Sequence, residues 1–196
     1  MSTAPEKRRF SFQMYLAYEE ASPTKHEFYR GEIFAMPGAG PRHNRIISNL
    51  LARLHGVLDG TDCEVYGSDQ RIRIDSADLS TYPDLTIICG ELRRHAIDRI
   101  AATNPRVVIE VLSSSTEKYN RGKKFELYQQ LESLEEYLLV AQEEPAITQL
   151  VRNDDGSWRY TLAHGPDSKL ELSCLPIQIP LSVIYRNVQF GPEDDA

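Results

Sequence analysis

The sequence has few cysteines and no long hydrophobic run. Its 196 residues include three cysteines, Cys63, Cys89 and Cys174. Because their number is odd, they lie far apart and Cys89 sits in an apolar segment, we expect reduced thiols in the cytoplasm and neither a disulfide framework nor structural zinc. No apolar stretch of export-signal length follows the basic N-terminal segment, and no run approaches membrane-spanning length. These absences predict a cytoplasmic protein without a membrane partner.

The sequence also lacks the motifs of several large enzyme classes. GxxxxGK[ST], HExxH, GxSxG and the glycine fingerprint of dinucleotide binding are all absent. Aromatic residues are only 9% of the chain and are not interleaved with basic ones, as they are in many RNA-binding modules. The formal net charge of -7 argues against non-specific coating of nucleic acid, but it leaves room for a local basic groove.

Hydrophobic spacing predicts one α/β (α+β) domain built on a central mixed sheet. Helical spacing predicts a short helix in 11–22, a long one over about 43–58 and a third from Thr116, the best-placed N-cap candidate in 113–116, to about 132. Strand-like patterns occupy 25–36, 63–74, 82–89, 106–112, 135–141, 146–152, 158–164 and 169–175. We expect the whole chain, 1–196, to form this domain, with loose ends at about 1–9 and 191–196.

Glu110 stands inside a strand that otherwise reads as buried on both faces. Its neighbours Val107, Val108, Ile109, Val111 and Leu112 leave almost no polar side. A carboxylate in such a strand is costly unless it is paired, neutralised or bound. Glu110 is therefore a candidate functional residue.

Asp84 and Lys124 are the natural companions of Glu110. Asp84 begins the preceding apolar strand, so adjacent strands could bring the two carboxylates together. In the helix that follows Glu110, Lys124 shares the apolar stripe with Leu127 and Tyr128. Two close carboxylates repel each other, and a divalent cation such as Mg²⁺ or Mn²⁺ removes that repulsion. With a lysine beside the attacking water, this constellation predicts metal-assisted phosphodiester hydrolysis.

This pattern resembles the PD-(D/E)xK nuclease superfamily, and within it the Uma-two family of restriction-type endonucleases. The resemblance is carried, in order, by RGEIFAMPGAGPRH (30–43), YPDLTII (82–88), VVIEVLSSST (107–116), KKFELY (123–128) and EEYLLV (135–140). It implies a restriction-endonuclease-like αβββαβ core with extra C-terminal strands.

The resemblance also implies a set of site residues. Asp84 and Glu110 would bind the metal and Lys124 would be catalytic. Glu32, from the GE of RGEI, would be a further acidic member of the catalytic and metal site, with His43 and Gln70 as neighbours. DNA is the implied substrate, and homodimers are common in this fold.

Two positions depart from the family pattern. Leu112 stands where the lysine of a literal ExK motif would be, and Asn120–Arg121 replaces a frequent acid–arginine pair. The alternative function is therefore a nuclease fold with a decayed site that binds nucleic acid or protein. A purely structural oligomeric protein is the third possibility.

Each candidate residue also has a purely structural interpretation. Glu110 could be a buried ion-pair partner, Asp84 a turn cap after Pro83, and Lys124 a side chain that extends its charge to water. Glu32 could belong to an ordinary turn, and His43 could merely lie near a helix N-terminus. The basic residues could line a phosphate-binding cleft, but a solvated face is the more ordinary interpretation. They are Arg42, Arg45, Arg71, Arg73, Arg93, Arg94 and 121–124.

Overall fold

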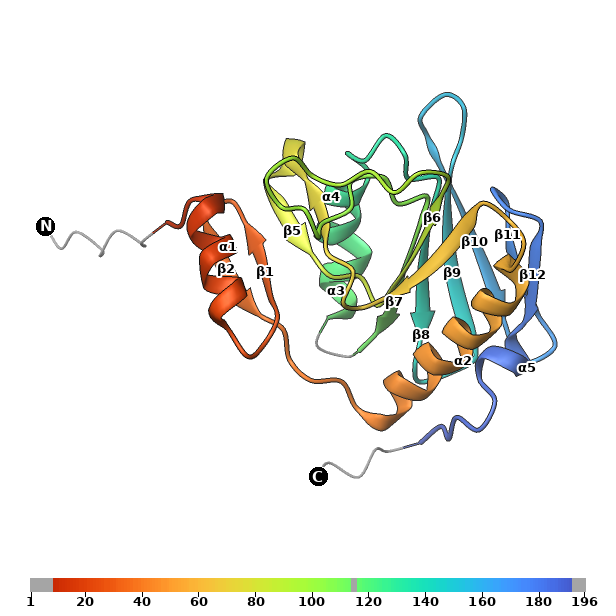
Figure 1. The fold of residues 1–196 in the computed structure, drawn as a ribbon. Helices are drawn as coiled ribbons and strands as arrows, with labels where there is room; N and C mark the ends of the chain where they lie inside the picture. Colours follow the sequence, from red (N-terminus) through yellow and green to blue (C-terminus); the bar gives the residue numbers. More distant parts are fainter. Residues whose placement is uncertain (1–8, 114–115, 192–196) are drawn as a thin grey trace, which may run out of the picture.

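A six-stranded mixed sheet forms the centre of the protein, whose computed structural model describes residues 9–113 and 116–191 (Figure 1). The strand order is β10-β9-β8-β7-β6-β3. The strands are β3 (Cys63–Gly67), β6 (Leu85–Cys89), β7 (Val107–Leu112), β8 (Glu136–Ala141), β9 (Ala146–Arg152) and β10 (Trp158–His164). β7 and β8 are parallel and the other neighbours are antiparallel, which confirms the predicted mixed sheet.

A smaller antiparallel sheet, in the order β2-β1-β5-β4, carries the N-terminal part of the chain. It consists of β1 (His26–Tyr29), β2 (Glu32–Ala35), β4 (Ile72–Ile74) and β5 (Leu79–Thr81), and α1 (Phe12–Ala21) precedes it. Figure 1 shows the β1–β2 hairpin and α1 at one end of the molecule, with the helical segment that follows β7 between them and the large sheet. The chain passes from the small sheet to the large one between β2 and β3, returns between β3 and β4, and enters the large sheet again between β5 and β6.

Helices cover both faces of the large sheet. α2 (Pro41–Leu58) packs Ile46, Leu50 and Leu54 into one core, together with the C-terminal hairpin β11 (Lys169–Leu172) and β12 (Ile177–Pro180) and with α5 (Leu181–Ile184). The other core holds apolar side chains from α4 (Phe125–Tyr128) and from the small sheet. α3 (Glu117–Tyr119) and a π-helical turn, η2 (Asn120–Lys124), lead into α4, and a short 3-10 turn, η1 (Asp75–Ala77), separates β4 from β5.

Alternation along β7 decides which core Glu110 faces. Val107, Ile109 and Val111 belong to the core under α2, whereas Val108 and Leu112 belong to the core under α4. Because successive side chains of a strand point to opposite faces, Glu110 shares the α4 side. The strand is therefore buried on both faces, as predicted, with its carboxylate among α4 and the small sheet.

Several predicted elements are shorter or divided in the structure. Segment 25–36 forms a hairpin that turns at Arg30 and Gly31, both with positive φ, and segment 63–74 forms β3 and β4 in different sheets. The strand predicted from 82 begins at 85, and the helical segment predicted to reach 132 ends at Tyr128. Ser114 and Ser115, two predicted cap candidates, lie outside the described residues, as do 1–8 and 192–196 of the predicted loose ends.

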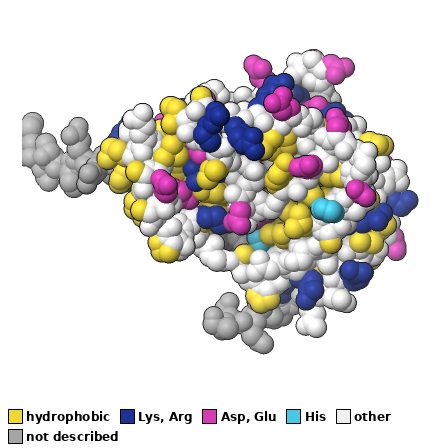
Figure 2. Space-filling model, viewed as in Figure 1, with side chains coloured by type: hydrophobic (Ala, Val, Ile, Leu, Met, Phe, Trp, Pro, Cys, Tyr) yellow, Lys and Arg dark blue, Asp and Glu magenta, His cyan; other side chains and the backbone are white. Residues whose placement is uncertain are grey.

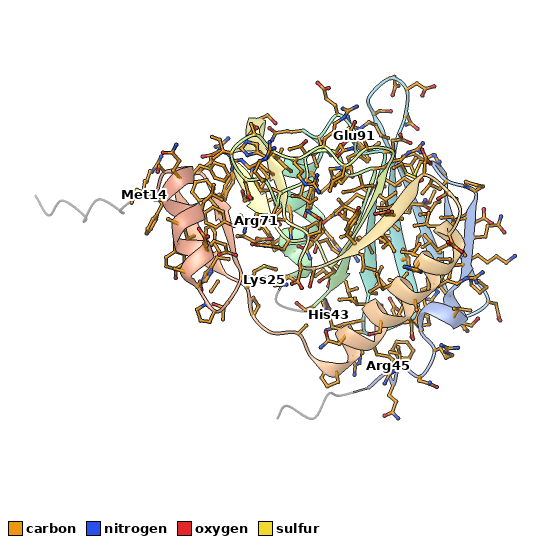
Figure 3. The ribbon with its side chains drawn as sticks, viewed as in Figure 1. Met14, Lys25, His43, Arg45, Arg71 and Glu91 are labelled. Atoms are coloured by element: carbon orange, nitrogen blue, oxygen red, sulfur yellow. A yellow bond between two sulfur atoms is a disulfide. The ribbon has the colours of Figure 1, made fainter. Side chains whose placement is uncertain are left out.

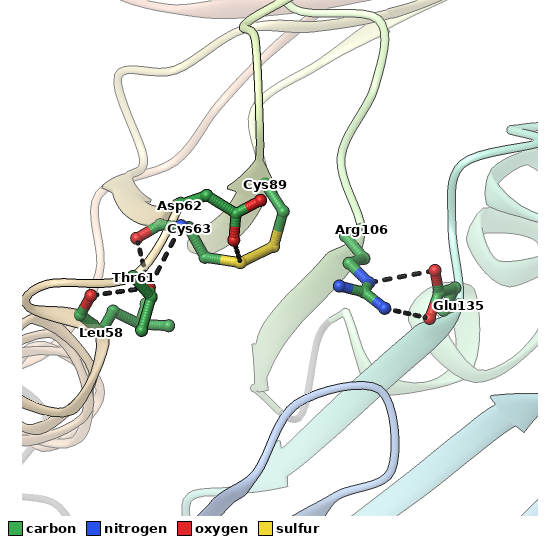
Figure 4. The surroundings of a disulfide bond; sticks show 7 residues. All are labelled: Leu58, Thr61, Asp62, Cys63, Cys89, Arg106 and Glu135. Carbon is green, nitrogen blue, oxygen red and sulfur yellow. Dashed lines mark hydrogen bonds and ion pairs between the residues drawn. A yellow bond between two sulfur atoms is a disulfide. The ribbon is translucent and has the colours of Figure 1, made fainter.

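The prediction of three free thiols was wrong. Cys63 and Cys89 are paired across β3 and β6 and form a disulfide with a Cα–Cα distance of 3.9 Å (Figure 4). The two residues are direct cross-strand partners, a relation that their separation in sequence does not reveal. Cys174 is the free cysteine among the described residues. No helix in the described part of the chain has the length and apolar character needed to cross a bilayer.

Candidate metal and phosphodiester site

Asp84 and Glu110 meet at the end of the large sheet. The β6–β7 register pairs Leu85 with Ile109, so one further step places Asp84 opposite Glu110. The Asp84 Oδ2 accepts a hydrogen bond of 2.7 Å from the backbone N–H of Val111. The side chains are 18% and 5% exposed, respectively. The structure thus brings together the two carboxylates that the sequence nominated.

Lys124 lies between two carboxylates. Its Nζ is 2.9 Å from Glu110 Oε1 and 3.1 Å from Glu27 Oε1, and its side chain is only 7% exposed. Lys124 closes the π-helical turn of η2, a local widening of the helix that occurs frequently at functional sites. Lys124 therefore lies on the buried face of this helical segment, the face on which the sequence placed it together with Leu127 and Tyr128.

Glu27 is the site residue that sequence reasoning missed. It lies on β1, where the register with β5 places it opposite Thr81, and the Thr81 hydroxyl donates a hydrogen bond to Glu27 Oε1. The usable signal in the sequence was the turn at Arg30 and Gly31, because a turn there divides the segment 25–36 into two strands and places Glu27 on the first of them. Glu32 was favoured instead because the family motif contains it.

The other predicted neighbours occupy different places. His43, on the first turn of α2, has its Nε2 3.2 Å from Asp84 Oδ2. Glu32 lies partly buried at the turn end of the hairpin, opposite Tyr29. Gln70 lies in the connection between β3 and β4, and its side-chain amide donates hydrogen bonds of 2.9 Å to the carbonyls of Arg71 and Ile100.

Two further groups surround the carboxylates. The Tyr128 hydroxyl donates to Glu110 Oε1 at 3.0 Å. Lys25 is on the hairpin side of the site and His43 on the α2 side (Figure 3). The Lys25 ammonium contributes to stabilising ionised Asp84, while its own hydrogen bonds reach Ser68 and Asp69. Lys25, which precedes β1, and His43, on α2, thus both lie in the neighbourhood of Asp84.

Burial makes both carboxyl groups reluctant to ionise. Burial raises the pKa of Asp84 to about 6, although the Val111 N–H and Lys124 oppose the shift. Burial, helped by repulsion from Asp84, raises the pKa of Glu110 to about 7, although Lys124 again opposes it. Burial also disfavours the charged form of Lys124, but Glu110 and Glu27 outweigh this effect and hold its pKa well above the ordinary value. The two carboxyl groups therefore change their protonation state near neutral pH, where a cation can compete with protons for their oxygen atoms.

The oxygen atoms of the two carboxylates suit a hard cation. The hydrogen bonds and ion pairs of Asp84 are made by Oδ2, and those of Glu110 are made by Oε1. Among the described residues, these contacts leave Asp84 Oδ1 and Glu110 Oε2 unused. No group of three or more His, Cys, Asp or Glu residues in the described chain is arranged to hold a metal. Two carboxylates fit Mg²⁺, which commonly keeps several waters and uses one or two protein carboxylates.

Several of the basic residues proposed for a phosphate-binding cleft are paired with acids. Arg71 and Arg73 are both buried, with Arg71 paired to Asp98 and Arg73 to Asp75 and Asp78, so neither a solvated face nor a phosphate-binding cleft describes them. Arg121 pairs with Glu117, and on the face seen in Figure 2 basic and acidic side chains are interspersed.

At one end of the mixed sheet, this α+β fold thus holds two opposed carboxylates and a buried lysine. The Uma2 family model, described as "Putative restriction endonuclease", matches residues 12–183, and the chain belongs to this family. The sequence match covers most of the structure described above, both sheets included.

Relatives of the chain include two proteins of Synechocystis sp. (strain ATCC 27184 / PCC 6803 / Kazusa). "Uncharacterized protein slr1290" is 38% identical over 93% of this chain and 94% of its own length. "Uncharacterized protein sll1609" is 32% identical over 83% of this chain and 92% of its own length.

A solved structure has the same fold. It is described as the crystal structure of a "putative nuclease belonging to DUF820" from Anabaena variabilis ATCC 29413, and it superposes with a TM-score of 0.72 at 15% identity. The match covers 90% of this chain and 97% of that one. At this identity the match establishes the fold of the chain.

Proposed function

We propose that the protein is a metal-dependent endonuclease that hydrolyses DNA phosphodiester bonds. The observation that carries the proposal is the opposition of Asp84 and Glu110, each with one oxygen engaged by the protein, beside the buried ammonium of Lys124. Membership of the Uma2 family supports the same class of chemistry.

Asp84 and Glu110 are the residues that would hold Mg²⁺ or Mn²⁺. When bound, such an ion polarises a phosphate oxygen and lowers the pKa of a bound water. Asp84 is fixed for this role by the Val111 N–H, and Glu110 by Lys124 and Tyr128. Glu32 remains a proposed further acid of the site, on the strength of the family motif alone.

Lys124 would stabilise negative charge that develops on the phosphate and orient the attacking water. Its ammonium is held by carboxylates on two different sheets and is shielded from solvent, which strengthens its field at the reacting group. Lys25 would contribute positive charge on the approach to Asp84, and His43 places a ring nitrogen beside the same carboxylate.

DNA and a second copy of the chain are the proposed partners, and the cytoplasm is the proposed location. Lys25, whose side chain is 36% exposed, offers a contact for the phosphate backbone near the site. The Cys63–Cys89 disulfide removes one argument for the cytoplasm, so that proposal now rests on the substrate.

Cleavage of supercoiled plasmid with Mg²⁺ and then Mn²⁺ tests the function. We expect metal-dependent nicking that falls about 100-fold or more in each of Asp84→Asn, Glu110→Gln and Lys124→Met. The matched control is Glu126→Gln, which removes a carboxylate from the exposed pair with the adjacent Lys123 and should leave nicking unchanged. Saturable DNA binding without cleavage by the folded protein would instead favour the decayed binding module.

A further inference from the structure

One buried ammonium serves two carboxylates that come from different sheets. Glu27 belongs to the small sheet and Glu110 to the large one, and Lys124 contacts both within 3.1 Å. The side chains of Glu27, Glu110 and Lys124 are 15%, 5% and 7% exposed. None of these charges can move readily to water, so a change at one must be compensated by the others.

Glu27 is held independently of the candidate metal residues. The Thr81 hydroxyl fixes its Oε1 from the opposite strand of the small sheet. Asp84 and Glu110, by contrast, are fixed through β7 and the helical segment. Glu27 can therefore keep its place while the charge around Glu110 changes.

We propose that Glu27 is a positioning residue that allows Lys124 and a divalent cation to share the Glu110 carboxylate. The inference rests on the proposed function. A cation at Glu110 repels the nearby ammonium and takes up part of the negative charge that holds it. Glu27 supplies the carboxylate that retains Lys124, so that the lysine stays charged and in place beside the cation.

The mutational cycle of Glu27→Gln and Lys124→Met tests this coupling through Mn²⁺ affinity measured by calorimetry. In the wild-type background, Glu27→Gln should weaken Mn²⁺ binding about tenfold, within the range of coupling between contacting residues, because the cation then leaves a buried ammonium without a partner. In the Lys124→Met background, the same substitution should change the affinity no more than about twofold.

Gln in place of Glu27 retains an amide oxygen that can accept from Thr81, so the variant should fold. Should it not, Thr81→Val loosens Glu27 without removing its charge and should weaken Mn²⁺ binding in the same direction. Glu126→Gln, which removes an equal charge from the exposed Lys123 pair, is the control that should leave the affinity unchanged.

The outcomes separate this inference from the proposed function. Equal losses in both backgrounds would make Glu27 a direct ligand and overturn the positioning role. Unchanged Mn²⁺ affinity in Glu27→Gln, with nicking by wild type intact, would overturn the inference alone. A wild-type protein that neither binds Mn²⁺ nor nicks DNA would overturn both.

Discussion

Lys124 and Glu110 are buried charges that tolerate burial only as partners. Lys124 has carboxylates on two sides, and Glu110 accepts from both Lys124 and Tyr128. Such a pair contributes little net stability, but removing one partner leaves the other uncompensated in a poorly solvated place. The same arrangement that suits catalysis therefore makes each residue sensitive to replacement.

Lys124→Met should destabilise the metal-free protein by about 3 kcal/mol at pH 8, because it leaves the buried Glu110 and the partly buried Glu27 without their cation. At pH 5 the loss should be smaller, since Glu110 has a pKa of about 7 even with Lys124 present and is then already protonated. Denaturant unfolding of both proteins at the two pH values measures the difference.

Adding Glu110→Gln to Lys124→Met should recover much of the lost stability at pH 8, because the double variant removes a charge that has lost its partner. Lys123→Met, at the exposed neighbouring position, is the matched control and should cost little. A loss for Lys124→Met that is identical at both pH values and unaffected by Glu110→Gln would contradict the charge-pairing explanation.

The β1–β2 hairpin is the element that delivers Glu27 to the site. Its turn requires positive φ at Arg30 (48°) and Gly31 (85°). A Cβ at Gly31 would also lie 3.1 Å from Arg9 Cβ and 3.3 Å from the carbonyl oxygen of Phe10. The turn is therefore restricted both by backbone conformation and by the chain that precedes α1.

Gly31→Ala should destabilise the protein by about 1–2 kcal/mol, because the substitution combines an unfavourable φ with a close contact. Gly60→Ala is the matched control: Gly60 has φ 77°, but nothing lies within 4 Å of its Cβ position, so only the backbone cost applies. Thermal unfolding compares the two. A smaller loss for Gly31→Ala than for Gly60→Ala would contradict the role of the contact.

Elements with a strong hydrophobic pattern were predictable from the sequence, and short ones were not. The long helix α2 and strands β7 to β10 could be predicted because their apolar residues recur at helical or strand spacing. The four strands of the small sheet have three or four residues each, and tertiary pairing decides their limits. Asp84, Glu110 and Lys124 were accessible because they interrupt strong patterns. Glu27 was harder to find, because the turn at Arg30 and Gly31 indicates its strand but not the pairing of that strand with β5, which brings Glu27 to the site.

At the scale of the whole molecule, the two carboxyl groups of the site link the stability of the protein to pH. Asp84 and Glu110 have folded-state pKa values of about 6 and 7, above their ordinary values of 3.8 and 4.5. The folded protein therefore holds more protons than the unfolded chain between about pH 4 and 7. Their contribution to stability is fully present below pH 4 and is lost as the pH rises through the folded-state values.

Metal-free protein should consequently lose stability, relative to an Asp84→Asn/Glu110→Gln double variant, as the pH rises from about 4 to 7. The groups that face the pair are common to both proteins, so the difference reports the two carboxyls together with their interactions with these groups. They are Lys124, Glu27, His43, Lys25 and Tyr128. Mg²⁺ should act in the opposite direction, because it binds the ionised pair: its stabilisation of the wild type should grow through pH 6–7 and be absent in the double variant. Thermal unfolding across this range, with and without Mg²⁺, measures both effects. A wild type whose stability relative to the double variant is constant from pH 4 to 7 would show that the carboxyls ionise normally in the fold, and the competition between proton and cation at this site would then be excluded.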